Sequence, residues 1–134
     1  MIALYRSALG VNIQSLLFIG KTVQTVSICE YLHRAQRYRG PFLIIAPLST
    51  LPHWQREFEN WTEMNVLVYH GSAAAREIIR DYEWWYYQSN NSTYGRDLQK
   101  FNVLITTYEV LLADEKLLSK FKWRYVCYFI VSFH

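Results

Sequence analysis

The sequence has little cysteine, and its cysteines and histidines lack the spacing of a structural metal site. The 134 residues include only two cysteines, Cys29 and Cys127, which lie far apart in the chain. The four histidines form no metal-binding motif either. This composition excludes a disulfide-rich secreted domain and a zinc ribbon. We interpret the two cysteines as reduced, buried thiols of an intracellular protein.

Long apolar runs and strong charge are also absent. The apolar stretch from Tyr125 to Phe133 is about half of the ~20 residues that a membrane helix needs. The N-terminal residues match neither a signal peptide nor an anchor. The formal net charge of +3 and the pI of about 8.9 permit a polyanionic partner without requiring one. These features predict a cytoplasmic or nuclear protein with no membrane partner.

What the sequence does contain is ample apolar and aromatic material for one core. Hydrophobic residues make up 51% of the chain and aromatic residues 17%, which is typical of an ordered domain. From Gly20 onward, short apolar runs alternate with helical patterns. We predict helices over 21–38, 51–61, 73–88 and 109–118, and strands over 42–46, 66–69, 101–106 and 125–131. A further short strand is expected at 16–19, and residues 89–97 read as a polar surface insertion.

This order of elements predicts an α/β fold. Alternating strands and helices form βαβ units, which give a mostly parallel sheet covered on both faces, a three-layer sandwich. We expect Ser49 or Thr50 to cap the helix at 51–61, with Pro52 in its first turn. The expected buried stripes of the helices at 51–61 and 73–88 comprise Trp54, Phe58 and Trp61, and Ile78, Ile79, Tyr82 and Tyr86, respectively.

The triplet Gly20-Lys21-Thr22 opens the first predicted helix and is typical of a phosphate-binding site. Backbone N–H groups and the helix dipole attract an anion at a helix start, lysine adds a charge, and the threonine hydroxyl can reach Mg²⁺. The triplet alone is weak evidence, because it often occurs by chance. It gains weight from the run 40–50, which reads as a buried strand ending in a polar loop, where α/β sheets bind ligands.

Three other features admit both a functional and a structural interpretation. The cations Arg34, Arg37 and Arg39 could contact nucleic acid, although a solvated helix end is the favoured interpretation. The aromatic run 82–87 could stack bases or form a methyl-lysine cage, but packing in the core is favoured. His70 could serve as a catalytic base, yet no nucleophile or acid accompanies it in sequence, so we favour a loop histidine.

Several motifs in order resemble the first RecA-like lobe of Swi/Snf-type helicase-related ATPases, and among these the chromodomain-helicase-DNA-binding (CHD) remodellers. The resemblance covers residues 20–126. The motifs are Gly20-Lys21-Thr22-Val23-Gln24-Thr25, Gly40-Pro41-Phe42-Leu43-Ile44-Ile45-Ala46-Pro47-Leu48-Ser49-Thr50, Trp54-Gln55-Arg56-Glu57-Phe58, Val68-Tyr69-His70-Gly71-Ser72 and Ile105-Thr106-Thr107-Tyr108-Glu109.

The resemblance implies a P-loop ATPase that translocates along duplex DNA and restructures nucleosomes in the nucleus. It assigns ATP and Mg²⁺ as cofactors, with Gly20, Lys21 and Thr22 at the nucleotide phosphates and Thr22 also at the metal. It further assigns contacts with the DNA backbone, through hydroxyls and backbone N–H groups, to Pro47, Ser49, Thr50, Thr106 and Thr107.

The chain departs from this family pattern at both ends. Residues 15–19 are Ser-Leu-Leu-Phe-Ile, where the family has an acidic pair and a further glycine. Residues 127–134 replace the strand end that carries Asp-Glu-Ala-His, and no carboxylate follows Glu115. We therefore expect a divergent segment 1–19, a partial helicase ATP-binding domain 20–126 and a divergent end 127–134.

These departures predict that the chain is an incomplete lobe with no catalytic residue of its own. The acids that hold Mg²⁺ and polarise the attacking water are missing, and so is the second ATPase lobe with its arginine finger. We expect no useful ATP hydrolysis by the chain alone. The alternative is a non-catalytic module, derived from such a lobe, that binds DNA or protein.

Overall fold

The centre of the fold is a parallel sheet. The computed structural model describes residues 22–35, 37, 40–86 and 99–128, and within them four strands lie in the order β2-β3-β1-β4. The strands are β1 (Phe42–Ile45), β2 (Val66–Val68), β3 (Val103–Thr106) and β4 (Tyr125–Tyr128). Every pairing among them is parallel, with Phe42 opposite both Val103 and Tyr125. The predicted parallel sheet is confirmed.

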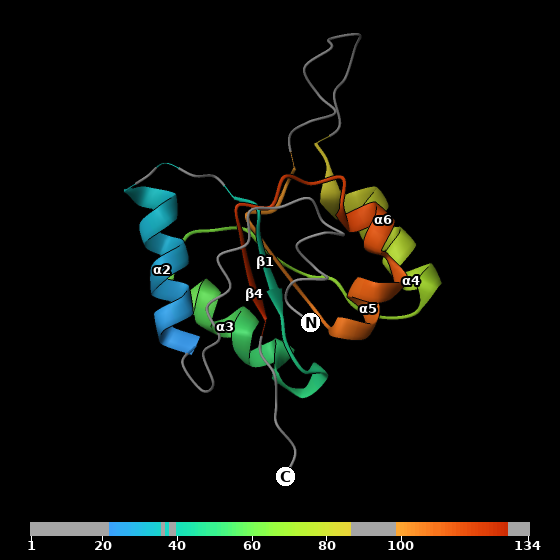
Figure 1. The fold of residues 1–134 in the computed structure, drawn as a ribbon, viewed down its shortest axis with the longest axis horizontal. Coiled ribbons are helices and arrows are strands. Elements are labelled where there is room, and N and C mark those ends of the chain that lie inside the picture. The colour runs from blue at the N-terminus through green and yellow to red at the C-terminus, as the bar shows by residue number, and fades with distance from the viewer. Residues whose placement is uncertain (1–21, 36, 38–39, 87–98, 129–134) are drawn as a thin grey trace, which may run out of the picture.

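Helices cover both faces of this sheet (Figure 1). On one face lie α2 (Thr22–Arg34) and α3 (Leu51–Trp61). On the other lie α4 (Ala73–Ile79), its continuation η2 (Arg80–Trp84), α5 (Tyr108–Ala113) and α6 (Glu115–Leu118). Side chains of β1 alternate between two cores: Leu43 and Ile45 pack toward α4–α6, whereas Phe42 and Ile44 pack toward α2 and α3. The three-layer α/β prediction is thus confirmed.

The first helix ends earlier than its sequence pattern suggested. α2 stops at Arg34 instead of near Tyr38, and the chain reaches β1 through Gly40. Gly40 has a φ of +83°, and a Cβ there would lie 2.6 Å from the carbonyl oxygen of Asn102. That oxygen accepts a hydrogen bond from the Phe42 N–H at 2.8 Å. Glycine is therefore required both by the backbone conformation and by this close approach.

The predicted cap of α3 is right in position, because Thr50 is the N-cap residue, but it lacks the expected side-chain hydrogen bond. A short 3₁₀ turn, η1 (Leu48–Thr50), precedes the helix, and no side chain caps its first N–H groups. The Thr50 hydroxyl instead donates to the Pro47 carbonyl at 2.7 Å. Pro52 does lie in the first turn, as predicted.

The predicted buried stripe of α3 holds in part. Trp54 and Phe58 are buried, as expected, and Leu51 completes the stripe. Trp61 is 65% exposed and donates its indole N–H to Glu57 at 2.9 Å. The last turn of α3 has passed the edge of the core, so its final aromatic ring faces solvent.

The buried side predicted for the next helix is largely wrong. Ile78, Tyr82 and Tyr86 are exposed, and the deeply buried residue is Trp84. The cause is a change of helical period, because the helix continues after Ile79 as the π-helical segment η2. The extra residue in a π turn places Ile79 and Trp84 on the same face. The segment ends at Trp84, before the predicted limit at residue 88, and Trp85 is extended and pairs with Gln99.

The remaining elements follow the predicted order. The helix expected at 109–118 is divided at Asp114 into α5 and α6. Cys29 and Cys127 are free and buried, as expected. The strand expected at 16–19, the insertion 89–97 and the strand end at 129–131 lie outside the described residues. None of the helices in the described ranges is long and apolar enough to cross a bilayer.

Candidate functional site

The predicted DNA-contacting residues gather at one edge of the sheet. Parallel strands all end at the same edge, and β1 and β3 are neighbours, so the loops that follow them lie side by side. The Ala46 N–H donates to the Thr106 carbonyl at 3.0 Å and joins the two loops. The loop after β2 joins them through Tyr69, whose N–H donates to the Ile105 carbonyl at 2.8 Å. We call this region the carboxyl edge: Ala46–Thr50, Tyr69–Ser72 and Thr106–Thr107.

Two of the predicted threonines have hydroxyls committed within the fold. Thr106 is buried, and its hydroxyl donates to the Tyr69 carbonyl at 2.7 Å. Thr107 is also buried and caps α5 by accepting the Val110 N–H at 3.4 Å. These side chains fix the shape of the loop after β3.

The loop after β1 is more open. Ser49 is exposed, whereas Pro47 and Thr50 are half-buried. The Thr50 N–H and hydroxyl both bond to the Pro47 carbonyl, at 2.9 and 2.7 Å. Ser49 therefore presents the most accessible of the five predicted side chains to a ligand at the carboxyl edge.

The described part of the phosphate-binding triplet lies at the start of α2. Gly20 and Lys21 are outside the described residues, and Thr22 is the half-buried first residue of the helix. The first turn contains no acidic side chain. Figure 1 shows that α2 begins at the end of the molecule at which β1 ends, so its N-terminus faces the carboxyl-edge side. A helix start in this position attracts anions.

Two thiols lie in the core between α2 and the sheet. Cys29 and Cys127 belong to the same buried cluster. Burial raises the pKa of Cys127 to about 12, and burial together with Cys127 raises the pKa of Cys29. Both therefore remain protonated at neutral pH, which makes them poor nucleophiles. Within the described ranges, no group of three His, Cys, Asp or Glu side chains could hold a metal ion.

A buried ionic cluster that the sequence analysis missed supports the carboxyl edge. Asp114, between α5 and α6, accepts the Nε–H of Arg76 at 2.7 Å and its Nη2–H at 3.3 Å. The Tyr69 hydroxyl also donates to Asp114. Arg80 donates to the Tyr69 hydroxyl at 2.7 Å and lies 3.5 Å from the Asp114 carboxylate. We call these four residues the Asp114 cluster.

The Asp114 cluster fixes the loop after β2 in place. Arg76 donates through Nη1 to the Gly71 carbonyl at 2.7 Å, while Tyr69 receives the hydroxyl bond of Thr106 on its backbone. Burial of the Asp114 carboxylate opposes ionisation, but hydrogen bonds from Arg76 and Tyr69 outweigh it and lower the pKa. Burial and the bond to Asp114 raise the pKa of Tyr69. The cluster is thus an ionised carboxylate held by neutral and cationic donors.

Sequence offered only a weak indication of this cluster. Arg76 and Arg80 are four residues apart and therefore share one helical face. Nothing local indicated that Asp114, 38 residues after Arg76, would lie opposite them. Asp114 itself lay inside a single predicted helix, next to a second acid, Glu115, so its sequence did not single it out.

The other candidate residues lie in a loop or at the end of α2. His70 is a half-buried loop residue, in line with the interpretation favoured from sequence. Arg34 is exposed and forms an ion pair with Glu30, as a solvated helix end would. Arg37 is exposed with a φ of 56°, and Arg39 lies outside the described residues.

Comparison with known proteins adds a family match. The sequence profile of the SNF2-related domain matches residues 17–128. Protein CHROMATIN REMODELING 5 of Arabidopsis thaliana is 48% identical over 109 residues, which cover 81% of this chain and 6% of that protein. Human chromodomain-helicase-DNA-binding protein 1 is 42% identical over 109 residues, again 81% of this chain and 6% of that protein. Human chromodomain-helicase-DNA-binding protein 8 is 44% identical over 108 residues, or 81% and 4%. The chain thus spans about one-twentieth of the length of these curated relatives.

Proposed function

The chain belongs to the SNF2-related domain family, and we propose from this premise that it forms the nucleotide-binding lobe of a nuclear, CHD-type chromatin remodeller. The observation that carries the proposal is the convergence of three features. The start of α2 and the loops after β1 and β3 lie toward one end of the sheet. Such an edge is where an α/β sheet binds its ligands.

The nucleotide phosphates would lie at the start of α2. Gly20 would allow the backbone to approach the phosphates, Lys21 would add a positive charge, and the Thr22 hydroxyl would contact Mg²⁺. The first turn of α2 has no carboxylate to repel an anion, which supports this assignment. Mg²⁺ would bind together with ATP, ligated mainly by phosphate oxygens and water.

A fluorescent ATP analogue, titrated into the full chain with Mg²⁺, tests this assignment. We expect saturable binding that Lys21→Ala weakens by about tenfold or more, equivalent to about 1.4 kcal/mol. Lys116→Ala is the matched control, because Lys116 is an exposed lysine of α6 on the other side of the sheet. Equally tight binding by the Lys21→Ala variant would refute a nucleotide site at the start of α2.

Duplex DNA would run along the carboxyl edge. Ser49 offers an exposed hydroxyl, while Pro47 and Thr50 shape its loop and Thr106 and Thr107 shape the next one. Contacts of this kind bind phosphates and position a protein on DNA without reading its sequence. The two buried threonines would therefore act by holding backbone N–H groups in place.

Fluorescence anisotropy with a short labelled duplex tests the DNA surface. We expect affinity to fall steeply with added salt, since phosphate binding releases counterions. Ser49→Asp should weaken binding several-fold through repulsion of phosphate, and Ser119→Asp, at an exposed position in the turn after α6, should not. If both substitutions weaken binding equally, DNA does not bind at the Ser49 loop.

ATP hydrolysis by this chain alone is not expected. Phosphoryl transfer needs charges placed around the γ-phosphate and the metal. Residues 127–134, where the family resemblance implies Asp-Glu-Ala-His, contain no acidic side chain. Release of phosphate from Mg²⁺-ATP over many turnovers, lost in Lys21→Ala, would contradict this.

The second candidate function is a non-catalytic module that uses the same edge. The exposed Ser49 loop and the firmly held Thr106–Thr107 loop would serve DNA or protein binding equally well without nucleotide. Absence of Lys21-dependent nucleotide binding, together with salt-sensitive DNA binding, would favour this function over the first.

A further inference from the structure

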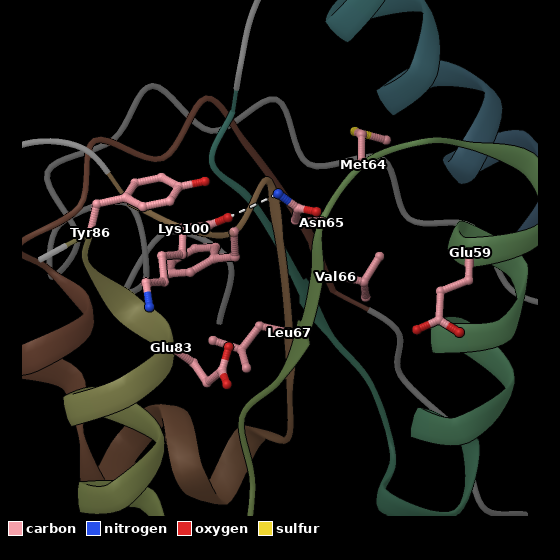
Figure 2. Close-up of a pocket in the computed structure, with 9 residues that line it drawn as sticks. Glu59, Met64, Asn65, Val66, Leu67, Glu83, Tyr86 and Lys100 are labelled. Carbon is pink, nitrogen blue, oxygen red and sulfur yellow. Dashed lines mark hydrogen bonds between the residues drawn. The ribbon is translucent and has the colours of Figure 1, made fainter.

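A second surface lies at the end of the strands opposite the carboxyl edge, where β2 and β3 begin. It is an open groove of about 500 Å³. The end of α3 forms one wall, the end of η2 forms the other, and β2 lies between them (Figure 2). The residues lining it include Glu59, Val66, Leu67, Glu83, Tyr86 and Lys100.

The floor of the groove is a strand whose outer edge is unpaired within the described part of the chain. β2 is the last strand in the sheet order and pairs there only with β3. The Asn65 carbonyl accepts the Val103 N–H at 3.1 Å, and the Tyr69 N–H donates to the Ile105 carbonyl. In a parallel ladder alternate residues bond to the same neighbour, so the backbone groups of Val66 and Val68 point outward. Such an edge is a template for another strand.

The two walls present carboxylates to whatever lies beside β2. Figure 2 shows Glu59 on the α3 side of the strand and Glu83 on the η2 side. Both residues are exposed. Among the described residues, Lys100 is the one cation that lines the groove, and it is already engaged: its ammonium donates to the Tyr82 carbonyl at 2.8 Å and lies 6.0 Å from the Tyr86 ring centroid. The walls therefore favour a basic occupant and disfavour nucleic acid.

We propose that this groove binds an extended, basic peptide segment of a partner protein, which adds a strand beside β2. Successive side chains of a strand point to opposite faces of the sheet. Two adjacent basic residues of the guest would therefore reach one wall each, one at Glu59 and the other at Glu83. Main-chain hydrogen bonds to Val66 and Val68 provide affinity, and the two glutamates provide selectivity.

The proposal is independent of the nucleotide and DNA sites, because the groove lies at the other end of the strands. The probe is a fluorescein-labelled peptide, Thr-Val-Lys-Arg-Val-Thr-Val-Thr, titrated into the full chain and followed by anisotropy. We expect saturable binding, lost when Glu-Glu replaces Lys-Arg in the peptide. Failure of the nucleotide experiments would leave this result unchanged.

Paired substitutions on the protein test the charge argument. Glu59→Lys combined with Glu83→Lys should weaken binding about tenfold or more. Glu109→Lys is the control, since Glu109 is an exposed glutamate of α5 and does not line the groove. Thermal unfolding of all variants checks that the fold is kept. Unchanged affinity in the double variant, or an equal loss in Glu109→Lys, would overturn the proposal.

Methylated peptides test the added strand itself. A guest strand donates hydrogen bonds to β2 from every second amide. N-methylation of the amides that face β2 should therefore abolish binding, whereas N-methylation of the amides that face away should leave binding intact. Equal binding of both methylated peptides would refute strand addition. Sedimentation without peptide would also refute the proposal if the chain forms a dimer that the peptide cannot dissociate, because a second copy would then occupy the edge.

Discussion

The Asp114 cluster allows the sharpest prediction on stability. Replacing Asp114 with Asn keeps the size of the side chain and removes its charge. The carboxylate accepts two bonds from Arg76 and one from Tyr69, and its side chain is 9% exposed. Asn retains one acceptor oxygen, but its NH₂ group would face a donor. The change therefore leaves half-buried cations without their counter-charge.

The magnitude follows from the burial of the partners. Breaking a fully buried ion pair costs about 3–5 kcal/mol. The Arg76 and Arg80 side chains retain 14% and 22% exposure, so water can partly solvate the freed guanidinium groups. We expect Asp114→Asn to lower the free energy of unfolding by about 2–3 kcal/mol. With a slope of about 2 kcal/mol per molar urea, the midpoint should fall by about 1–1.5 M.

Urea unfolding followed by tryptophan fluorescence measures this loss. Trp84 is a suitable reporter, because its ring centroid lies 5.3 Å from that of Tyr69 in the Asp114 cluster. Glu109→Gln, at an exposed position of α5, should change the free energy by no more than about 0.5 kcal/mol. A double-mutant cycle with Arg76→Met should give a coupling energy of about 1 kcal/mol or more. A midpoint for Asp114→Asn equal to that of the wild type would refute the reasoning.

The same residue fixes the sign of the acid dependence. The folded state lowers the pKa of Asp114, so its contribution is present above the ordinary carboxyl pKa of about 3.9. That contribution is lost as the pH falls through the lower, folded-state pKa. Below pH ~4 the wild type should therefore lose more stability than Asp114→Asn. Identical acid profiles would contradict the assignment.

Three further predictions concern other parts of the fold. Gly40→Ala should destabilise by about 2 kcal/mol or more in urea, because its Cβ would strike the Asn102 carbonyl at a positive φ; an unchanged midpoint would contradict the required glycine. Trp54→Ala should cost about 3–5 kcal/mol in the same assay, while the exposed Trp61→Ala should cost less than about 1 kcal/mol; equal costs would disprove the assigned faces of α3. Burial raises the pKa of Cys127 to about 12, so the unfolded chain ionises first and stability should fall as the pH rises above about 8.5. Cys127→Ala should show a shallower alkaline slope, and an equally steep slope would argue against the buried thiol.

The strands could be predicted because their own residues favour a buried strand, whatever the contacts with distant residues. Phe42 to Ala46 is a continuous apolar run, and such runs form strands covered on both faces. All residues of β1 and β3 are indeed buried. The parallel order followed from the alternation of strand and helix, which needs no knowledge of side-chain contacts.

The buried face of the helix after β2 could not be predicted from the regular helical spacing of its residues. A pattern of 3.6 residues per turn pointed to Ile78, Tyr82 and Tyr86, whereas the π-helical turn moves Trp84 inward. Trp84 packs there against Tyr69 and Phe121, with ring centroids 5.3 and 4.9 Å away. Burying a large indole in this aromatic core favours such a change of winding, and that gain depends on residues distant in sequence.

In the candidate site, too, local motifs predict some features, and others depend on contacts between residues distant in sequence. The family resemblance assigned DNA contacts to residues after β1 and after β3, yet it gave no reason to rank Ser49 above Thr106. The structure provides that reason. The Thr106 hydroxyl is bound to the Tyr69 carbonyl, and the Tyr69 side chain is in turn bound to Asp114. A hydroxyl committed to this chain of hydrogen bonds can reach a ligand only by breaking a buried bond, which costs about 1–3 kcal/mol. The exposed Ser49 meets no such cost, so substitutions at Ser49 should alter binding while substitutions at Thr106 should first alter stability.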